Sequence, residues 1–211
     1  METSFDVRGY FHVFSFAQAS KLFFLKNLDC YVALQFIMEK NKYKISSRIL
    51  EELFMSKVLV VYYSYSNTTK NLAKDIAIIT DGDMRELIPE KPYSFTYNGA
   101  TKEARSEMER GYCPKLLSGN ESINNYKYIF VGTPNWFKSF APPILSFLRS
   151  VDLNEKIIIP FCTHGGGGFG QIEINISKEC PNSKLLPGFA ATSDFDDKQV
   201  QSWLDSIGIL A

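Results

Sequence analysis

A continuous run of β-branched and aromatic residues, from Val58 to Tyr63, constrains the fold of this chain more than any other feature. Such runs are typical of strands that are buried on both faces, as in a parallel sheet covered by helices. Four more segments read as strands. They are Met84 to Ile88, Tyr128 to Gly132, Ile157 to Cys162 and Leu185 to Ala191.

Segments with helical spacing separate these strands. They are Thr68 to Ile79, Pro142 to about Val151, Phe169 to Cys180, and a last helix opened by a capping box of Ser193 and Asp196. Strands that alternate with helices predict a right-handed, doubly wound α/β sheet of five strands. In such a sheet, ligands bind at the carboxyl ends of the strands.

The residues before Met55 have a different character, which predicts a helical extension over 1–54 and an α/β domain over 55–211. Phe16, Ala19 and Phe23 recur at helical spacing. About 55 residues make a marginal core without disulfides or a metal. We therefore expect the extension to pack on the domain or on a second copy of the chain, and favour a homodimer.

Charge and cysteine usage narrow the function classes. Lys and Arg number 23, as do Asp and Glu, so no field of one sign would attract nucleic acid or an anionic membrane. The four cysteines contain no C-x-x-C pair, and no metal site is expected. No charge-free run reaches the ~18 residues of a spanning helix, and the opening residues lack a signal-peptide pattern. We expect a cytoplasmic protein.

Three loops follow predicted strands and carry unusual chemistry. The first, Ser64 to Lys70, joins a strand to a helix with a run of hydroxyl and amide side chains. Free amides at a helix N-terminus, together with short hydroxyls, can bind a phosphate without a lysine or a metal. Asn67 also tolerates the left-handed backbone of a tight turn. An ordinary N-cap rich in Ser and Thr is the alternative.

The second and third loops follow the third and fourth strands. Gly132 to Phe137 places Trp136 at a strand end, where it would stack on a flat ligand or cap the core. Gly165 to Gly168 follow His164, and consecutive glycines suit a backbone that approaches a ligand closely. His164 could donate to a ligand oxygen or be merely solvated.

Together the three loops resemble the flavodoxin family, above all the short-chain, flavodoxin-like FMN proteins of bacteria. That family has S-x-[ST]-G-N-T, G-x-P-x-W and P-F-x-T-H-G-G-x-G after its first, third and fourth strands. Here the matching segments are 64–69, 132–136 and 160–168, and the resemblance covers Met55 to Ala211. The phosphate loop departs from the family in having Asn67 where glycine is usual.

The resemblance implies a flavodoxin-like sheet in the order 2-1-3-4-5 with bound FMN. By this resemblance, the phosphate ligands are Ser64, Ser66, Asn67, Thr68 and Thr69. The residues that line one face of the ring are Thr133, Pro134, Asn135 and Trp136. Those at the polar edge of the ring are Thr163, His164, Gly165, Gly166, Gly167 and Gly168.

The implied function is electron transfer by FMN, as an oxidoreductase with a small-molecule acceptor or as a carrier with a redox partner. Two alternatives stay open. One is a flavodoxin-like interaction module without cofactor. The other is a redox-responsive regulator that uses the N-terminal helices, although the chain leaves no room for a recognition helix between Leu53 and Lys57.

Overall fold

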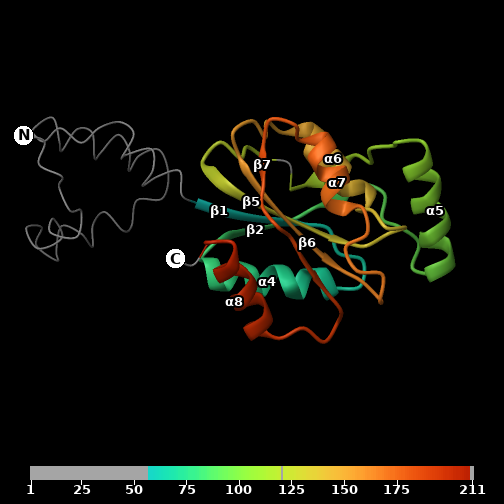
Figure 1. Cartoon of the computed structure of the whole chain (residues 1–211). Coiled ribbons are helices and arrows are strands. Elements are labelled where there is room, and N and C mark those ends of the chain that lie inside the picture. The colour runs from blue at the N-terminus through green and yellow to red at the C-terminus, as the bar shows by residue number, and fades with distance from the viewer. Residues whose placement is uncertain (1–56, 120, 210–211) are drawn as a thin grey trace, which may run out of the picture. The chain divides into compact units, whose positions relative to one another are not determined.

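The computed structural model describes residues 57–119 and 121–209 (Figure 1). The predicted helical extension over 1–54, and the dimer expected through it, lie outside these residues. Within them, no helix is long and apolar enough to cross a membrane.

A parallel sheet forms the centre of the domain, and its strand order is β2-β1-β5-β6-β7, with β8 also paired to β6. Its strands are β1 (Lys57–Tyr62), β2 (Asp83–Glu86), β5 (Tyr126–Pro134), β6 (Ile157–Thr163), β7 (Lys184–Leu185) and β8 (Phe189–Ala191). Since β7 and β8 together form the fifth strand, the predicted order 2-1-3-4-5 is confirmed.

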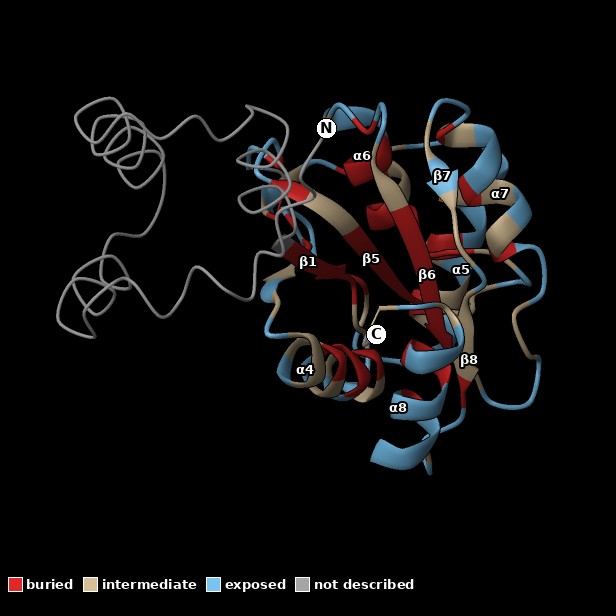
Figure 2. Ribbon diagram, turned by 60° about the vertical axis from the view of Figure 1, so that its left-hand side comes forward, coloured by how far each residue is buried: buried red, intermediate tan, exposed pale blue. Residues whose placement is uncertain are grey.

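Helices cover both faces of the sheet (Figures 1 and 2). Helices α4 (Thr68–Thr80) and α8 (Asp197–Ser206) pack on one face, and α6 (Pro142–Ser150) and α7 (Ile172–Glu179) on the other. Successive residues of β1 point to opposite faces: Val60 packs with the α4 and α8 cluster, and Val61 with the α6 and α7 cluster. Both are fully buried. The apolar run that predicted the sheet is therefore an inner strand, which lies between β2 and β5.

The structure corrects four predicted boundaries. The second strand ends at Glu86, and Ile88 instead pairs antiparallel with Ser118 in a separate two-stranded sheet, β3 (Ile88–Pro89) and β4 (Leu116–Ser118). The fifth strand is interrupted at 186–188, where Pro187 has no N–H to donate.

The other two corrections concern helix starts. Helix α7 begins at Ile172 and not at Phe169, because the glycine loop continues as far as Gly170, whose φ is 61°. The last helix has Asp196 as its N-cap, and Ser193 takes no part in the cap. Asp196 and Gln199 form the capping box, each side chain accepting from the other's backbone N–H.

One helix was not predicted. Helix α5 (Tyr97–Glu109) follows β3 and packs against α6. It buries only Ala100 and Ala104, so its sequence carries no strong apolar period. Its N-cap is Thr96, whose hydroxyl accepts from the N–H of Gly99.

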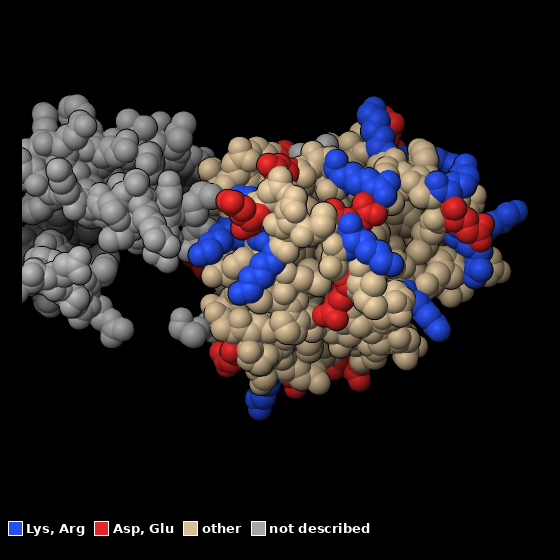
Figure 3. Space-filling view, turned by 45° about the horizontal axis from the view of Figure 1, so that its top comes forward, with Lys and Arg blue, Asp and Glu red and all other residues tan. Residues whose placement is uncertain are grey.

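The charges on the surface follow the balance in the composition. On the face drawn in Figure 3, Lys and Arg side chains are interspersed with Asp and Glu, and no broad region has one sign.

Candidate functional site

The loops after β1, β5 and β6 meet at the carboxyl edge of the sheet and are linked in pairs. The hydroxyl oxygens of Thr69 and Thr163 lie 2.7 Å apart, joining the first and third loops. The side-chain amide of Asn135 donates to the carbonyl of Gly168 at 2.6 Å, joining the second and third. The ring centroid of Tyr65 lies 5.9 Å from that of Trp136, joining the first and second. The topology thus gathers the predicted site residues in one place.

The first loop presents unbonded backbone amides at the start of α4. Asn67 has φ 65° and ψ −7°, the left-handed conformation that its sequence position predicted. Its side chain makes no capping hydrogen bond. None of the N–H groups of residues 66–69 donates to an acceptor in the described part of the chain. These amides lie at the positive end of the helix dipole, an arrangement suited to an anion.

The hydroxyls of this loop take two roles. Ser66 and Thr68 are the outward pair, with hydroxyl oxygens 3.3 Å apart beside the unbonded amides. Ser64 instead accepts from the N–H of Lys70 at 3.2 Å, and the buried Thr69 hydroxyl is paired with Thr163. These inner contacts hold the loop in shape, and the amides and the outward hydroxyls face solvent.

The only cation in this loop is held elsewhere. The ammonium of Lys70 lies 2.7 Å from a carboxylate oxygen of Glu86 on β2. An anion at the start of α4 would therefore be bound by amides and hydroxyls, as the sequence predicts for a phosphate site without a lysine.

Trp136, in the second loop, is held by three tyrosines. Its ring packs edge-to-face with those of Tyr63, Tyr65 and Tyr93, at centroid distances of 5.6, 5.9 and 5.0 Å. Trp136 is only partly buried, so it both packs on the core and presents surface to the site. These three contacts fix the orientation of the Trp136 ring.

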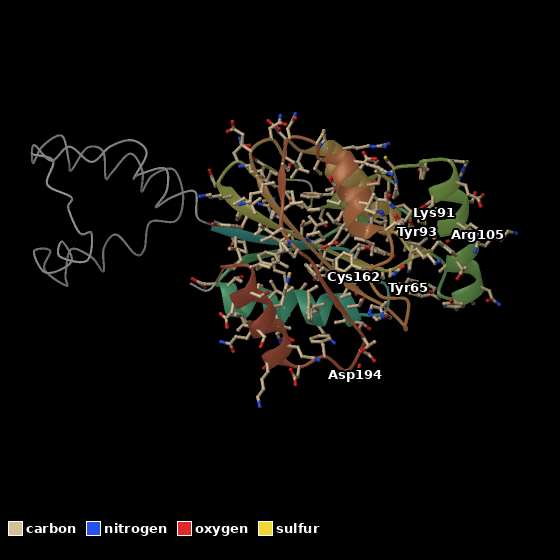
Figure 4. All side chains as sticks on the ribbon, viewed as in Figure 1. Tyr65, Lys91, Tyr93, Arg105, Cys162 and Asp194 are labelled. Atoms are coloured by element: carbon tan, nitrogen blue, oxygen red, sulfur yellow. The ribbon has the colours of Figure 1, made fainter. Side chains whose placement is uncertain are left out.

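The tyrosines are fixed in turn by polar contacts. The hydroxyl of Tyr65 donates to the carbonyl of Ser94 at 2.8 Å, and that of Tyr93 donates to the carboxylate of Glu107 on α5. Burial, and then the bond to Glu107, raise the pKa of Tyr93 far above its ordinary value. The phenol therefore stays protonated. Figure 4 shows Tyr65 and Tyr93 on the side of the domain where α5 lies.

The remaining second-loop residues shape the backbone. Thr133 is fully buried; its hydroxyl donates to the carbonyl of Pro134 and accepts from the N–H of Ala141. Beyond Asn135, two backbone hydrogen bonds between Trp136 and Ser139 close a tight turn. Its central residues, Phe137 and Lys138, have φ of 52° and 64°, which defines a turn usually made by Asn-Gly.

The third loop exposes its backbone. Gly166 and Gly168 have φ of 114° and 62°, so glycine is needed there for conformation. Gly165 has an ordinary backbone, and a Cβ on it would meet no atom within 4 Å. Packing within the described part of the chain therefore does not require a glycine at this position. A Cβ on Gly166 or Gly168 would likewise meet no atom within 4 Å, and one on Gly167 would meet only the side-chain nitrogen of Asn135, at 3.6 Å.

His164 and Cys162 flank this backbone. The Nδ1 atom of His164 accepts from the N–H of Gly166 at 3.0 Å, so a neutral ring carries its proton on Nε2. Burial raises the pKa of the Cys162 thiol to about 12. Cys162 is therefore a neutral packing residue and not a nucleophile.

Sequence reasoning missed the supporting residues Tyr65, Tyr93 and Glu107. Tyr93 lies 43 residues before Trp136, and no local pattern indicates that contact. For Tyr65, its position inside the phosphate-loop motif could have indicated a role in the site. Within the described residues, no group of three or more His, Cys, Asp or Glu lies together as a metal site would require.

A family model described as Flavodoxin matches residues 57–207. No curated protein matches the chain. Among solved structures, a protein from Bacteroides eggerthii DSM 20697 assigned as a flavoprotein is 29% identical, with a TM-score of 0.66, over 72% of this chain and 98% of its own.

Two other structures are similar. A protein from Bacteroides uniformis ATCC 8492, likewise assigned as a flavoprotein, is 28% identical, with a TM-score of 0.65, over 72% of this chain and 99% of its own. A flavoprotein in complex with FMN from Lactobacillus acidophilus NCFM is 22% identical, with a TM-score of 0.58, over 70% of this chain and 98% of its own, and shares the fold. The sheet order, the three linked loops and the match over 57–207 show that the chain belongs to the flavodoxin family.

Proposed function

We propose that this protein binds FMN and transfers electrons, as an oxidoreductase acting on a small acceptor or a redox partner. The observation that carries the proposal is the row of unbonded amides at residues 66–69, which begins a helix at the switch point of the sheet. The FMN complex of the Lactobacillus acidophilus protein, which has the same fold, supports the choice of cofactor.

The residues of this chain fit the parts of FMN. The amides of 66–69, with the hydroxyls of Ser66 and Thr68, bind the phosphate. Trp136 offers an aromatic surface to the isoalloxazine, and the backbone of Gly165 to Gly168 contacts the polar edge of the ring. Bound FMN supplies one- and two-electron redox chemistry, and the protein orients it and excludes water.

The supporting contacts keep the site in place. The bond from Asn135 to Gly168 sets the spacing between the second and third loops, and the pair of Thr69 and Thr163 sets that between the first and third. His164 keeps Nε2–H available to a ligand, because Nδ1 accepts from the N–H of Gly166. No protein nucleophile is needed. We place this function in the cytoplasm, because free cysteines such as Cys162 and Cys180 stay reduced there.

The test is a titration of the cofactor-free protein with FMN, riboflavin and FAD, in which binding is monitored through the quenching of flavin fluorescence. FMN should bind more tightly than riboflavin, because only FMN has the terminal phosphate monoester that the amides of 66–69 would bind. Heating the loaded protein should release FMN, identified by its mass. Protein that quenches none of the three flavins contradicts the proposal and leaves the cofactor-free interaction module.

A further inference from the structure

We propose that the acceptor is a planar aromatic molecule with a negative charge, and that Arg105 on α5 binds that charge beside the flavin site. The inference rests on the proposed function and specifies its substrate class. Its basis is that Arg105 and exposed aromatic side chains lie beside the first and second of the three loops assigned to the flavin.

Helix α5 is attached to those loops near both of its ends. Just before its start, the carbonyl of Ser94 accepts from Tyr65 of the first loop at 2.8 Å. Toward its end, the guanidinium carbon of Arg105 lies 4.4 Å from the ring centroid of Phe137, the residue after Trp136. The helix therefore runs along the mouth of the site, and Figure 4 shows Arg105 on the same side of the domain as Tyr65 and Tyr93.

The outer surface of this segment is aromatic. Phe95 is 99% exposed and Tyr97 is 79% exposed. Tyr97 and Arg105 lie eight residues apart, with Thr101 between them, so the three share one face of α5. Exposed aromatic rings beside a redox centre would stack on a flat ligand, which would remove them from water.

The cations in this region outnumber the carboxylates. Within the described residues, only Glu90 is paired with a cation, Lys115, at 2.8 Å, whereas Glu103 and Glu107 keep their charge while accepting from the N–H of Ser94 at 2.9 Å and from Tyr93. Glu109, one turn beyond Arg105, makes no ion pair with it. The cations of this region without a carboxylate within 4 Å in the described part of the chain outnumber these carboxylates. They are Lys91, Lys102, Arg105, Arg110 and Lys138.

Arg105 is the cation best placed to select a ligand. Its stacking on Phe137 holds the planar guanidinium beside the loop of Trp136, and its N–H groups remain free for a carboxylate or sulfonate. Lys91 and Lys138 are exposed and add to the local potential. A quinone bound here would take up two electrons and two protons and leave as the hydroquinone, while the reduced FMN returns to its oxidised form.

The experiment compares naphthoquinone sulfonate with uncharged naphthoquinone as acceptors. The FMN-loaded protein is reduced with stoichiometric dithionite under anaerobic conditions, and its reoxidation is followed by stopped-flow absorbance over a range of quinone concentrations. Arg105→Gln should weaken the apparent affinity for the sulfonate about tenfold and leave the uncharged quinone within about twofold. Arg105→Lys should restore part of the affinity, and added salt should reduce the preference.

Two further variants separate stacking from charge. Tyr97→Ala should weaken both quinones alike, by about threefold to tenfold. Lys198→Gln, an exposed cation at the start of α8 on the opposite face of the sheet, should change neither. The proposal is wrong if Arg105→Gln affects both quinones equally, or if the unaltered protein shows no preference for the sulfonate. Failure of the proposed function is seen earlier, as absence of FMN binding before any quinone is added.

Discussion

The buried hydroxyl pair of Thr69 and Thr163 allows a quantitative test of how the first and third loops are joined. The two oxygens lie 2.7 Å apart, the residues are 1% and 6% exposed, and they are 94 positions apart in sequence. Thr69→Val removes one hydroxyl and leaves the other buried without a partner. Thr163→Val does the same from the other side.

The expected energies follow from that geometry. A buried hydroxyl that loses its partner costs about 1 to 3 kcal/mol, so each single variant should lose about 2 kcal/mol of the free energy of unfolding. The double variant replaces both hydroxyls by methyl groups of similar shape and should lose less than about 1 kcal/mol. If the two effects were additive, the double variant would lose about 4 kcal/mol. The difference between that sum and the smaller loss measured for the double variant is the coupling energy of the two hydroxyls.

The assay is urea unfolding of the cofactor-free protein, which removes any stabilisation by bound ligand. Each single variant should also lower Tm by about 4 to 8 °C. Thr101→Val serves as the control, because the Thr101 hydroxyl bonds only to the carbonyl of Tyr97 on the surface of α5. It should change stability by less than about 0.5 kcal/mol. Additive losses in the double variant, or singles that cost no more than the control, would refute the reasoning.

Three other predictions address the cofactor, the thiols and the extension. The double variant Ser66→Ala with Thr68→Ala should weaken the binding of FMN at least tenfold, because two donors to a charged phosphate are lost. The binding of riboflavin should be almost unchanged in the same fluorescence titration, and equal loss for both flavins would place the phosphate elsewhere. Burial raises the pKa of Cys162 to about 12 and of Cys180 to about 11. The stability that these neutral thiols contribute is therefore complete below pH 9 and is lost as pH rises through 9 to 12. Urea unfolding across that range should show this loss, and a flat profile contradicts it. A chain that begins at Met55 should keep its affinity for FMN and elute as a smaller species on gel filtration if residues 1–54 form a dimer interface; an unchanged oligomeric state excludes that interface.

Much of the architecture could be predicted because its signals are local. The run from Val58 to Tyr63 fixes a doubly buried strand, and parallel strands carry their following loops to one edge. That rule alone brings Asn67, Trp136 and Gly165 together without any knowledge of their contacts. The left-handed backbone of Asn67 also follows from residue chemistry, since Asn tolerates αL better than other residues with a side chain.

The parts that could not be predicted depend on contacts distant in sequence. Helix α5 buries two alanines and so lacks an apolar stripe, and its position is set by Glu107 bonding to Tyr93. Phe137 and Lys138 adopt positive φ although neither residue type favours it, because the paired hydrogen bonds of Trp136 and Ser139 close the turn around them. No intrinsic preference of a single residue encodes such arrangements.

The break in the fifth strand has a consequence for association between molecules. Among the strands of residues 57–119 and 121–209, those that follow β6 at the margin of the sheet are β7, of two residues, and β8, of three, with Pro187 and Gly188 between them. An outermost strand with a continuous row of free N–H and C=O groups is a template for pairing with strands of other molecules, and short pieces separated by proline offer no such row. This margin of the sheet therefore resists the strand-to-strand aggregation to which open parallel sheets are prone.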